Sequence, residues 1–361
     1  MEPRQYLVLG MMSGTSMDGV DLALTQFTYQ KAWKYEVLEA RTVPYEKEWL
    51  DRFKKADSLR PEELIQLDHD YGKYLGLLAS NFLNGREILL ISSHGHTLFH
   101  RPEKGYSFQI GHGADLHAQT GFPVVCDFRS VDVALGGQGA PLVPVGETYL
   151  FSDYAFLVNL GGIANLTYRQ ADGKVKAKDF GFANMGLNLL ASQKGRSYDD
   201  DGQMARKGRV SKDFTTALEQ AYLKIPPVSL SRELFEQFLE PVLLDSKYLL
   251  EDRLCTFVHV LALKLRGELQ VHVESEQLLK PRLLLTGGGA ENSFLVDVLR
   301  AKTSDLCHLV VPSIEVIRYK EALIFGFLGL RRLMGATNAL SSVTGALQES
   351  VGGALYGALK V

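Results

Sequence analysis

Short apolar runs on either side of a small-residue turn open the chain. Residues 5–29 predict a β-hairpin, because each apolar run has the length of a strand and the turn between them is rich in glycine and hydroxyl groups. Residues 35–43 predict another strand that ends before a proline. The spacing of apolar residues becomes that of a helix from 47 to about 83. Within this stretch, Pro61 and the two acids that follow it mark the start of a helix.

The same alternation of apolar strands and helical segments continues through the rest of the chain. Further strands are predicted at 87–92, 122–126 and 281–285, and helices at 210–223, 230–270, 293–301 and 320–333. The small-residue tail at 341–359 predicts a turn followed by a helix. Strands separated by helices indicate an α/β protein with a mixed sheet and helices outside it.

One design of strand, small-residue turn and strand occurs twice, about 150 residues apart. The first turn carries Ser13, Gly14, Thr15, Ser16, Met17, Asp18 and Gly19, and the second carries Asn159, Leu160, Gly161 and Gly162. Such turns let backbone N–H groups approach an anion, although a tight hairpin turn needs no ligand. Neither turn contains the lysine of a P-loop. Two such hairpins facing each other across a cleft would hold a nucleoside triphosphate, which favours a two-lobed phosphotransferase.

Composition narrows the class of protein further. The 361 residues are enough for two domains, and 46% hydrophobic with 22% charged residues is ordinary for a globular protein. A net charge of −3 without a basic block argues against nucleic acid as a partner. The absence of a long apolar run argues against a membrane partner, and the N-terminus does not resemble a signal peptide. Three scattered cysteines suggest a reducing compartment, so we expect a cytoplasmic protein.

Two further glycine-rich segments follow. The strand at 281–285 leads directly into Gly287, Gly288 and Gly289, with Asn292 just beyond, where a flat group such as adenine can lie against the backbone. A simple strand–helix turn is the alternative. The loop at 135–141 is a candidate hinge.

Histidines and carboxylates supply the remaining candidate chemistry. His94, His96 and His100 lie close together, and the His-x-His pattern on a strand points both rings to one side. We favour hydrogen bonding to a polar substrate over a zinc site, and a purely structural role is the third alternative. Asp179, just past the strand-like residues 175–178, is placed to act as a general base at a strand end, although such acids often only cap turns. Asp127, which lies close to Arg129, and Asp132 are further acids at a strand end and in the following loop. We interpret the acidic run 199–201 as a solvated turn.

Ordered motifs along nearly the whole chain resemble the 1,6-anhydro-N-acetylmuramic acid kinases of the sugar kinase/Hsp70/actin superfamily. The matching segments are 10–21, 93–97, 127–129, 136–144, 159–165, 287–292, 320–322 and 342–346. The resemblance implies an actin-like (ribonuclease H-like) fold of two duplicated lobes with mixed five-stranded sheets. Lobe I would comprise residues 1–140 joined by the tail 341–361, and lobe II residues 141–340. It also implies a cytoplasmic enzyme of cell-wall recycling and suggests a homodimer.

The reaction implied by the resemblance opens the 1,6-anhydro ring with water and phosphorylates O6 from ATP, with Mg²⁺ as cofactor. The general base aligns with Asp179. The implied ATP and phosphate ligands are the first turn (13–19) with Asn159, Gly161, Gly162, Gly287, Gly288, Gly289 and Asn292, and Asp18 is the implied Mg²⁺ ligand, directly or through water. The implied sugar ligands are His94, His96, Thr97, Asp127, Arg129, Gln138, Gly139 and Glu321.

The chain also departs from the family pattern. The usual Thr, Pro and second Gly after the base are Phe180, Phe182 and Ala183, and an Asp beyond them is Asn188. Other departures are His96 for Gln, Arg318 for Asp, and the segment 227–233. The departures leave two alternatives open, a kinase of the same fold acting on another sugar and a non-catalytic ATP-binding switch.

Overall fold

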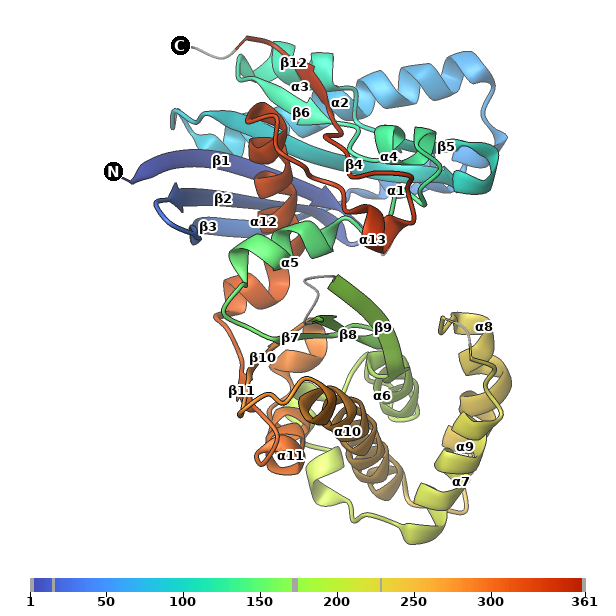
Figure 1. Ribbon diagram of the computed structural model, residues 1–361. Coiled ribbons are helices and arrows are strands. Elements are labelled where there is room, and N and C mark those ends of the chain that lie inside the picture. Colours follow the sequence, from blue (N-terminus) through green and yellow to red (C-terminus); the bar gives the residue numbers. More distant parts are fainter. Residues whose placement is uncertain (1–2, 15–16, 171–174, 228, 359–361) are drawn as a thin grey trace. The chain divides into compact units, whose positions relative to one another are not determined.

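The chain forms two compact units. The computed structural model describes residues 3–14, 17–170, 175–227 and 229–358 (Figure 1). The first unit comprises Met1–Ser152 with Tyr319–Val361, and the second comprises Asp153–Arg318. Residues 141–152 and 319–340 therefore belong with the first unit, whereas the sequence analysis places both stretches in the second lobe.

The sheet of the first unit has a five-strand centre with two additions. Its central order is β3-β2-β1-β4-β6, in which β1, β2 and β3 are antiparallel and β4 and β6 run parallel to β1. These strands are β1 (Arg4–Ser13), β2 (Gly19–Tyr29), β3 (Trp33–Pro44), β4 (Leu90–Arg101) and β6 (Val124–Cys126). Two antiparallel strands extend it, β5 (Tyr106–Ile110) on β4 and β12 (Ala354–Tyr356) on β6.

The sheet of the second unit repeats that central order. Among the described residues it has five strands in the order β9-β8-β7-β10-β11, with the first three antiparallel and the last two parallel to β7. The strands are β7 (Phe156–Leu160), β8 (Ile163–Arg169), β9 (Val175–Phe182), β10 (Arg282–Thr286) and β11 (His308–Val310). The prediction of a duplicated, actin-like α/β fold is confirmed, with two strands more than expected in the first sheet.

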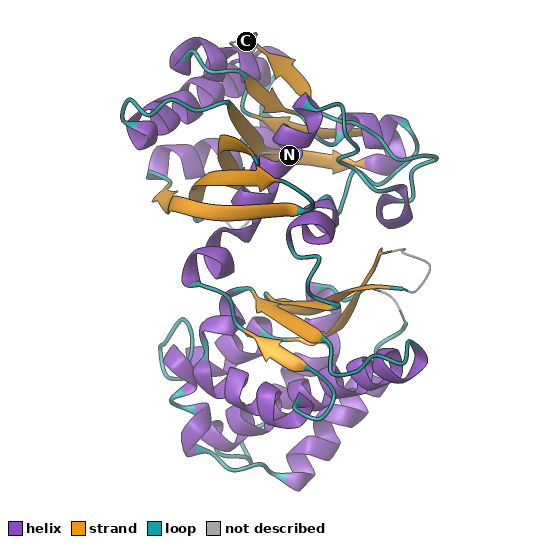
Figure 2. Cartoon of the chain, turned by 60° about the vertical axis from the view of Figure 1, so that its left-hand side comes forward, coloured by secondary structure: helices purple, strands orange, loops and turns teal. Residues whose placement is uncertain are grey.

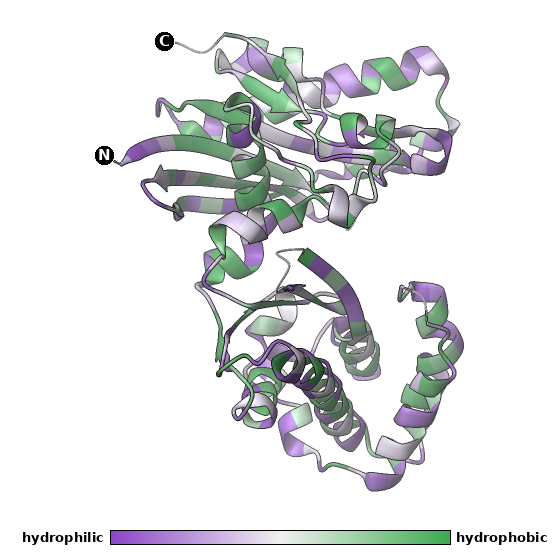
Figure 3. Ribbon diagram, in the orientation of Figure 1, coloured by the Kyte–Doolittle hydropathy of each residue, from purple (hydrophilic) through white to green (hydrophobic). Residues whose placement is uncertain are grey.

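Helices cover both faces of the first sheet (Figures 1 and 2). Alternation along β1 explains this, because Leu9 joins the core under α2 while neighbouring Gly10 lies against Ala322 of α12. Hydrophobic residues accordingly follow both the strands and α12 in Figure 3. The helices of this unit are α1 (Lys47–Lys54), α2 (Pro61–Leu83), α3 (Gly113–Thr120), α4 (Ser130–Ala134), α5 (Val143–Leu150), α13 (Ser341–Thr344) and, after its first turn, α12 (Ile314–Leu333).

The second unit has its own core around the long helix α10. Fully buried Leu261 and Leu265 of α10 pack with Val158 and Leu285 of the sheet. The helices are α6 (Asn184–Ser192), α7 (Lys212–Leu223), α8 (Arg232–Leu234), α9 (Glu240–Leu243), α10 (Leu250–Ser275) and α11 (Ser293–Thr303), with a π-helical turn (Phe235–Leu239) between α8 and α9.

Several predicted elements differ in the structure. The polar cluster 93–97 lies within β4 and not after it, because β5 pairs with this stretch and extends the strand. Asp179 likewise lies inside β9. The tail forms a short helix and then strand β12, since its backbone bonds to the edge strand β6. No helix in the described part of the chain has both the length and the apolar character that crossing a bilayer requires.

Candidate functional site

In the second unit, the structure brings two of the predicted glycine turns together. The turn after β7 and the segment after β10 touch, because a Cβ on Gly287 would lie 2.6 Å from Asn159 Oδ1 and 2.8 Å from the Leu160 backbone. Gly287 also has φ +81°, which favours glycine. Asn184 joins them by donating from Nδ2 to the Leu160 carbonyl at 3.0 Å. Predicted residues Asn159 and Gly287 thus share one site.

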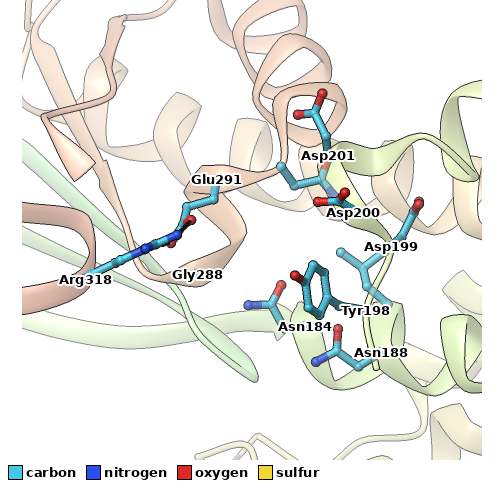
Figure 4. A pocket seen from close by; sticks show the side chains of 11 residues that line it. Asn184, Asn188, Tyr198, Asp199, Asp200, Asp201, Gly288, Glu291 and Arg318 are labelled. Carbon is cyan, nitrogen blue, oxygen red and sulfur yellow. Dashed lines mark hydrogen bonds and ion pairs between the residues drawn. The ribbon is translucent and has the colours of Figure 1, made fainter. Parts of the chain in front are cut away.

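A polar cavity of about 420 Å³ opens beside these glycines (Figure 4). In that view Tyr198 lies near Asn184 and Asn188, while Glu291 and Arg318 pair elsewhere along the wall. The lining residues are Asn184, Leu187, Asn188, Tyr198, Asp199, Asp200, Asp201, Gly288, Glu291, Asn292 and Arg318. The volume falls in the range of small-molecule sites, and an exposed tyrosine ring beside a glycine backbone offers a flat surface.

The acidic run 199–201 forms part of this cavity wall, so its interpretation as a solvated turn is wrong for its first member. Asp199 is buried and accepts hydrogen bonds from the backbone N–H groups of Met204 at 2.8 Å and Ala205 at 2.9 Å. Asp201 is exposed and accepts from Ser293 N at 3.0 Å, at the start of α11. These bonds hold the run against the glycine segment.

Two other lining residues have structural partners. Asn292 caps α11, since its side chain accepts from Leu295 N at 2.9 Å. Arg318, a departure from the family pattern, forms two hydrogen bonds with the Glu291 carboxylate, one from Nε at 2.9 Å. Glu291 lies within the matching segment 287–292 but was not among the predicted ligands. Tyr198 was not identified from the sequence, because no local pattern links it to residues 287–289.

The predicted base, Asp179, lies half-buried on β9 opposite Asn165 of β8. Its Oδ2 accepts a hydrogen bond from Leu230 N at 3.0 Å, which ties the segment before α8 to the carboxylate. Within the described part of the chain, this is the one hydrogen bond that the carboxylate accepts. Oδ1 therefore keeps its capacity to accept a proton or a hydrogen bond.

The neighbouring departures at 180 and 182 have a packing role. Phe180 and Phe182 are buried in the core of the second unit, and the Phe182 ring meets Phe235 edge-on at 5.2 Å between centroids. The backbone N–H of Phe182 also donates to the Tyr222 hydroxyl at 3.1 Å. These side chains face α10 and the π-helical turn, so they change the core behind the base.

In the first unit, the first predicted phosphate turn joins β1 to β2. Thr15 and Ser16 lie outside the described residues. Met17 N donates to the Gly14 carbonyl at 3.3 Å, Met17 itself has φ +60°, and Gly19 begins β2. Asp18 is exposed at the turn, and its charge helps burial to raise the pKa of Asp21.

Beneath this turn, Ser13 belongs to a buried chain of hydrogen bonds. Its hydroxyl lies 2.5 Å from the Tyr45 hydroxyl and 2.8 Å from His96 Nδ1, and Tyr45 continues to Tyr71 at 2.5 Å. The His96 ring stacks on Phe53 at 4.3 Å, and burial lowers its pKa to about 4. His96 is therefore a neutral core residue that holds the end of β1.

His94 and His96 do not share one face, so that expectation is wrong. Gly95 between them has φ +73°, and Met12 of β1 stands opposite both His94 and Gly95 of β4, which is a β-bulge. The His94 ring packs on Phe325 of α12, whereas the His96 ring lies on the α2 side. Burial, with the nearby Arg129 charge, lowers the pKa of His94 to about 3.

Arg129 connects His94 to the loop 135–141. Its guanidinium lies 2.8 Å from His94 Nε2 and donates to the Gly139 carbonyl at 2.6 Å. Gly139 N in turn donates to the buried Asp132 carboxylate at 2.8 Å, and Thr344 Oγ1 donates to its other oxygen at 2.7 Å. These bonds fix the loop inside the first unit, so it is not the boundary between units.

The other predicted sugar ligands lie around this loop and β4. Gln138 is exposed, with its backbone N–H bonded to the Thr344 carbonyl at 2.8 Å. Asp127 has φ +55° and accepts from Ser130 Oγ at 2.6 Å, and Thr97 accepts from Gln109 at 3.3 Å. Glu321 on α12 reaches solvent, yet the protein around its carboxyl group partly desolvates it, which raises the pKa of Glu321.

A duplicated actin-like fold, glycine turns at strand ends and a polar cavity beside a glycine segment define a phosphotransferase of the sugar-kinase type. The chain belongs to the anhydro-N-acetylmuramic acid kinase family, whose model matches residues 6–358. Proteins named anhydro-N-acetylmuramic acid kinase resemble it over nearly their whole length.

Those relatives are about one-third identical to the chain. The protein of Shewanella loihica is 33% identical, covering 98% of this chain and 99% of its own. The protein of Rippkaea orientalis is 33% identical, and the match covers 94% of this chain and 96% of its own. The protein of Vibrio cholerae is also 33% identical, and the match covers 97% of this chain and 98% of its own. The solved structure of a ROK family glucokinase from Streptomyces griseus, in complex with glucose and AMPPNP, matches 89% of this chain and 98% of its own at 11% identity. The TM-score of 0.39 is too low for this structural likeness to support an argument.

Proposed function

We propose that this kinase opens the anhydro ring of 1,6-anhydro-N-acetylmuramic acid with water and transfers the γ-phosphoryl group of ATP to O6. The products are N-acetylmuramate 6-phosphate and ADP, as expected for an enzyme of peptidoglycan recycling. Family membership over residues 6–358 supports the reaction class. The observation that carries the proposal is the half-buried Asp179 carboxylate, held by Leu230 N with an oxygen left to accept a proton.

Asp179 has the chemistry that the first step needs. Its carboxylate takes a proton from water, and the water oxygen bonds to C1 of the sugar while the C1–O6 bond breaks. The freed O6 then bonds to the γ-phosphorus, and the bond to the ADP oxygen breaks. Positioning of the two reactants and neutralisation of phosphate charge supply most of the remaining catalysis.

We assign the nucleotide to the glycine turns and the cavity of the second unit. The turns at 159–162 and 287–289 are in contact, and their five glycines carry no side chains that would keep a phosphate from the backbone. The adenosine would lie in the cavity against Gly288 and the Tyr198 ring, with the Arg318–Glu291 pair fixed beside it. The turn at 13–19 of the first unit would donate to the phosphates, with Asn292 holding the start of α11.

Asp18 fits the role of a Mg²⁺ ligand. It is an exposed carboxylate at the end of a turn rich in backbone donors, and Mg²⁺ prefers one or two carboxylates together with phosphate oxygens and water. When bound, the ion would neutralise charge on the transferring phosphoryl group. Asp18 itself would hold the ion directly or through water.

We propose that the sugar is bound by groups of the first unit, which are buried Gly139 and a set of exposed or half-buried side chains. Arg129, Gln138, Gly139, Glu321, Asp127 and Thr97 offer both charge signs and several donors and acceptors. His94 is buried with both ring nitrogens hydrogen-bonded, and His96 is buried with Nδ1 bonded to Ser13, so we propose that each acts through its partner. His94 positions Arg129, and His96 positions Ser13.

The proposal predicts that Asp179→Asn removes sugar-dependent ADP release. A general base contributes roughly 10²–10⁴-fold, so we expect a loss of at least about a hundredfold in kcat. A coupled ADP assay with ATP, Mg²⁺ and the anhydro-sugar measures it. Asp57→Asn, which neutralises an exposed acid in the 3₁₀ turn before α2, serves as the matched control and should keep wild-type activity.

Two results would contradict this assignment. Undiminished ADP release by Asp179→Asn, with nucleotide binding retained, would remove that residue from the role of base. A panel of sugars lacking the anhydro bridge tests the substrate, because only ring opening adds a molecule of water to the sugar as well as a phosphoryl group, and mass spectrometry of the product detects that addition. Turnover of such sugars alone would favour a kinase of different specificity, and nucleotide binding without turnover would favour a switch protein.

We also propose a cytoplasmic location, where ATP is available, and a homodimer, which the family resemblance suggests. Fractionation of cells expressing the full chain tests the first, and light scattering after gel filtration tests the second. A scattering mass near the 40.1 kDa of one chain would refute the dimer.

A further inference from the structure

Away from the residues assigned to the kinase, two histidines and an aspartate meet between α2 and α3. His69 comes from α2, His112 immediately precedes α3, and Asp115 lies in the first turn of α3. One donor atom from each lies within 4.8 Å of the other two. We propose that His69, His112 and Asp115 form a binding site for a single zinc ion.

The donors already converge on one point. His69 Nδ1 lies 2.6 Å and His112 Nδ1 2.8 Å from the same oxygen of Asp115, and the two rings are 4.1 Å apart between centroids. A carboxylate only accepts, so each ring carries its proton on Nδ1 in this arrangement. Zinc bonded at about 2.0–2.1 Å needs its donors roughly 3.3 Å apart, so side-chain shifts of about half an ångström admit the ion.

Electrostatics at the cluster suit a cation. The Asp115 carboxylate lies between the two imidazoles and accepts a hydrogen bond from each, so an acidic group stands at the centre of the cluster. A second acid, Asp68, lies beside the histidines and accepts from Gly111 N at 2.7 Å, which fixes the loop carrying His112. Two nearby carboxylates offset the charge of a divalent ion.

The donor set selects the type of ion. Two imidazole nitrogens and one carboxylate oxygen are typical zinc ligands, whereas Mg²⁺ and Ca²⁺ prefer oxygen only. His69 and His112 retain partly exposed side chains, at 40% and 30%, so the ion can enter and water can complete the tetrahedron. Binding through Nδ1 would move the single proton of each neutral ring from Nδ1 to Nε2, and the ion would cross-link α2 to the start of α3.

The test uses the full chain after treatment with a chelator. Addition of Co²⁺, as a coloured substitute for zinc, should give visible absorption of tetrahedral intensity that saturates near one ion per chain and disappears when Zn²⁺ is added. Calorimetry with Zn²⁺ should show the same stoichiometry of one ion per chain. Zinc should also raise the melting temperature, since it binds the folded state.

Variants locate the ion. His69→Gln and Asp115→Asn should each weaken Zn²⁺ binding at least about tenfold, as loss of a ligand requires. His308→Gln, which changes an exposed histidine on β11, is the matched control and should bind as the wild type does. Circular dichroism verifies that each variant is folded.

Failure of the wild-type chain to give the cobalt absorption or a one-to-one zinc isotherm would overturn the proposal, whatever the variants do. Equal affinity in His69→Gln and the wild type would also overturn it. In either case the three residues would form only a hydrogen-bonded contact between α2 and α3. The readouts are independent of phosphoryl transfer, so the outcome does not depend on the proposed function.

Discussion

At the scale of single residues, His96 shows how a polar group within a core controls the start of a functional turn. Its ring is fully buried, stacked on Phe53 and bonded to Ser13 at the end of β1. Because burial lowers its pKa to about 4, the neutral form is the one compatible with the fold.

This residue predicts a specific dependence of stability on pH. Unfolded His96 titrates near 6.5 and folded His96 near 4, so the unfolded state binds the extra proton between these values and stability falls as the pH falls through that window. The full effect is about 3 kcal/mol. Urea denaturation of wild type and His96→Gln from pH 7 to pH 4 should show the variant gaining stability relative to wild type.

Acidic groups titrate in both the wild type and His96→Gln, so their effect on the free energy of unfolding cancels when the two profiles are compared. His308→Gln changes an exposed histidine and should track the wild type at every pH. Parallel profiles for wild type and His96→Gln would show that His96 is not desolvated in the folded state.

The same scale explains which site residues could be identified from the sequence. Local motifs such as 159–162 and 287–289 predict turns, and the structure brings these two into contact. The bulge at Gly95 could not be predicted, because it depends on pairing between β4 and two other strands. Tyr198 was missed for a similar reason, since its place beside Gly288 depends on tertiary packing.

At the scale of elements, close contact between β1 and α12 determines the architecture of the first unit. Gly10 faces the helix so closely that a Cβ would lie 1.9 Å from the Ala322 carbonyl oxygen. The sequence predicted both the strand and the helix but assigned 320–340 to the other lobe. Nothing in its local pattern shows that Gly10 and Ala322 meet.

Gly10→Ala should therefore destabilise the protein strongly. The added methyl collides with a helix backbone, so we expect a loss of about 3 kcal/mol in the free energy of unfolding, at the upper end for overpacking. Gly267→Ala is the control, because a Cβ there meets no atom within 4 Å in the middle of α10. It should add about 0.5–1 kcal/mol, and chemical denaturation of both variants checks the contrast. Equal stabilities would refute the close contact.

At the scale of the whole molecule, the two units differ in how the chain builds them. The second is one continuous stretch, Asp153–Arg318, with its own buried core. The first combines an N-terminal stretch with Tyr319–Val361, which supplies most of α12 and strand β12. The duplicated strand order does not reveal this difference, which arises from where α12 packs.

A fragment of residues 153–318 should fold alone. Its core includes residues from both its sheet and α10, so we expect a cooperative thermal transition by circular dichroism. A fragment of residues 1–152 is the comparison, and it should lack such a transition because Gly10 and Phe27 lose the helix that covers them. Non-cooperative melting of the 153–318 fragment would contradict the independence of its core.

The discontinuity of the first unit has a consequence during synthesis on the ribosome. Strands β1 to β6 emerge more than a hundred residues before α12, so one apolar side of the nascent sheet stays exposed to solvent while the intervening segment is translated. The second unit, which is complete once Arg318 has been made, can fold before the first. The first unit would depend on chaperones until residues 319–361 have been synthesised. A premature stop codon after residue 318 would therefore yield an aggregation-prone product.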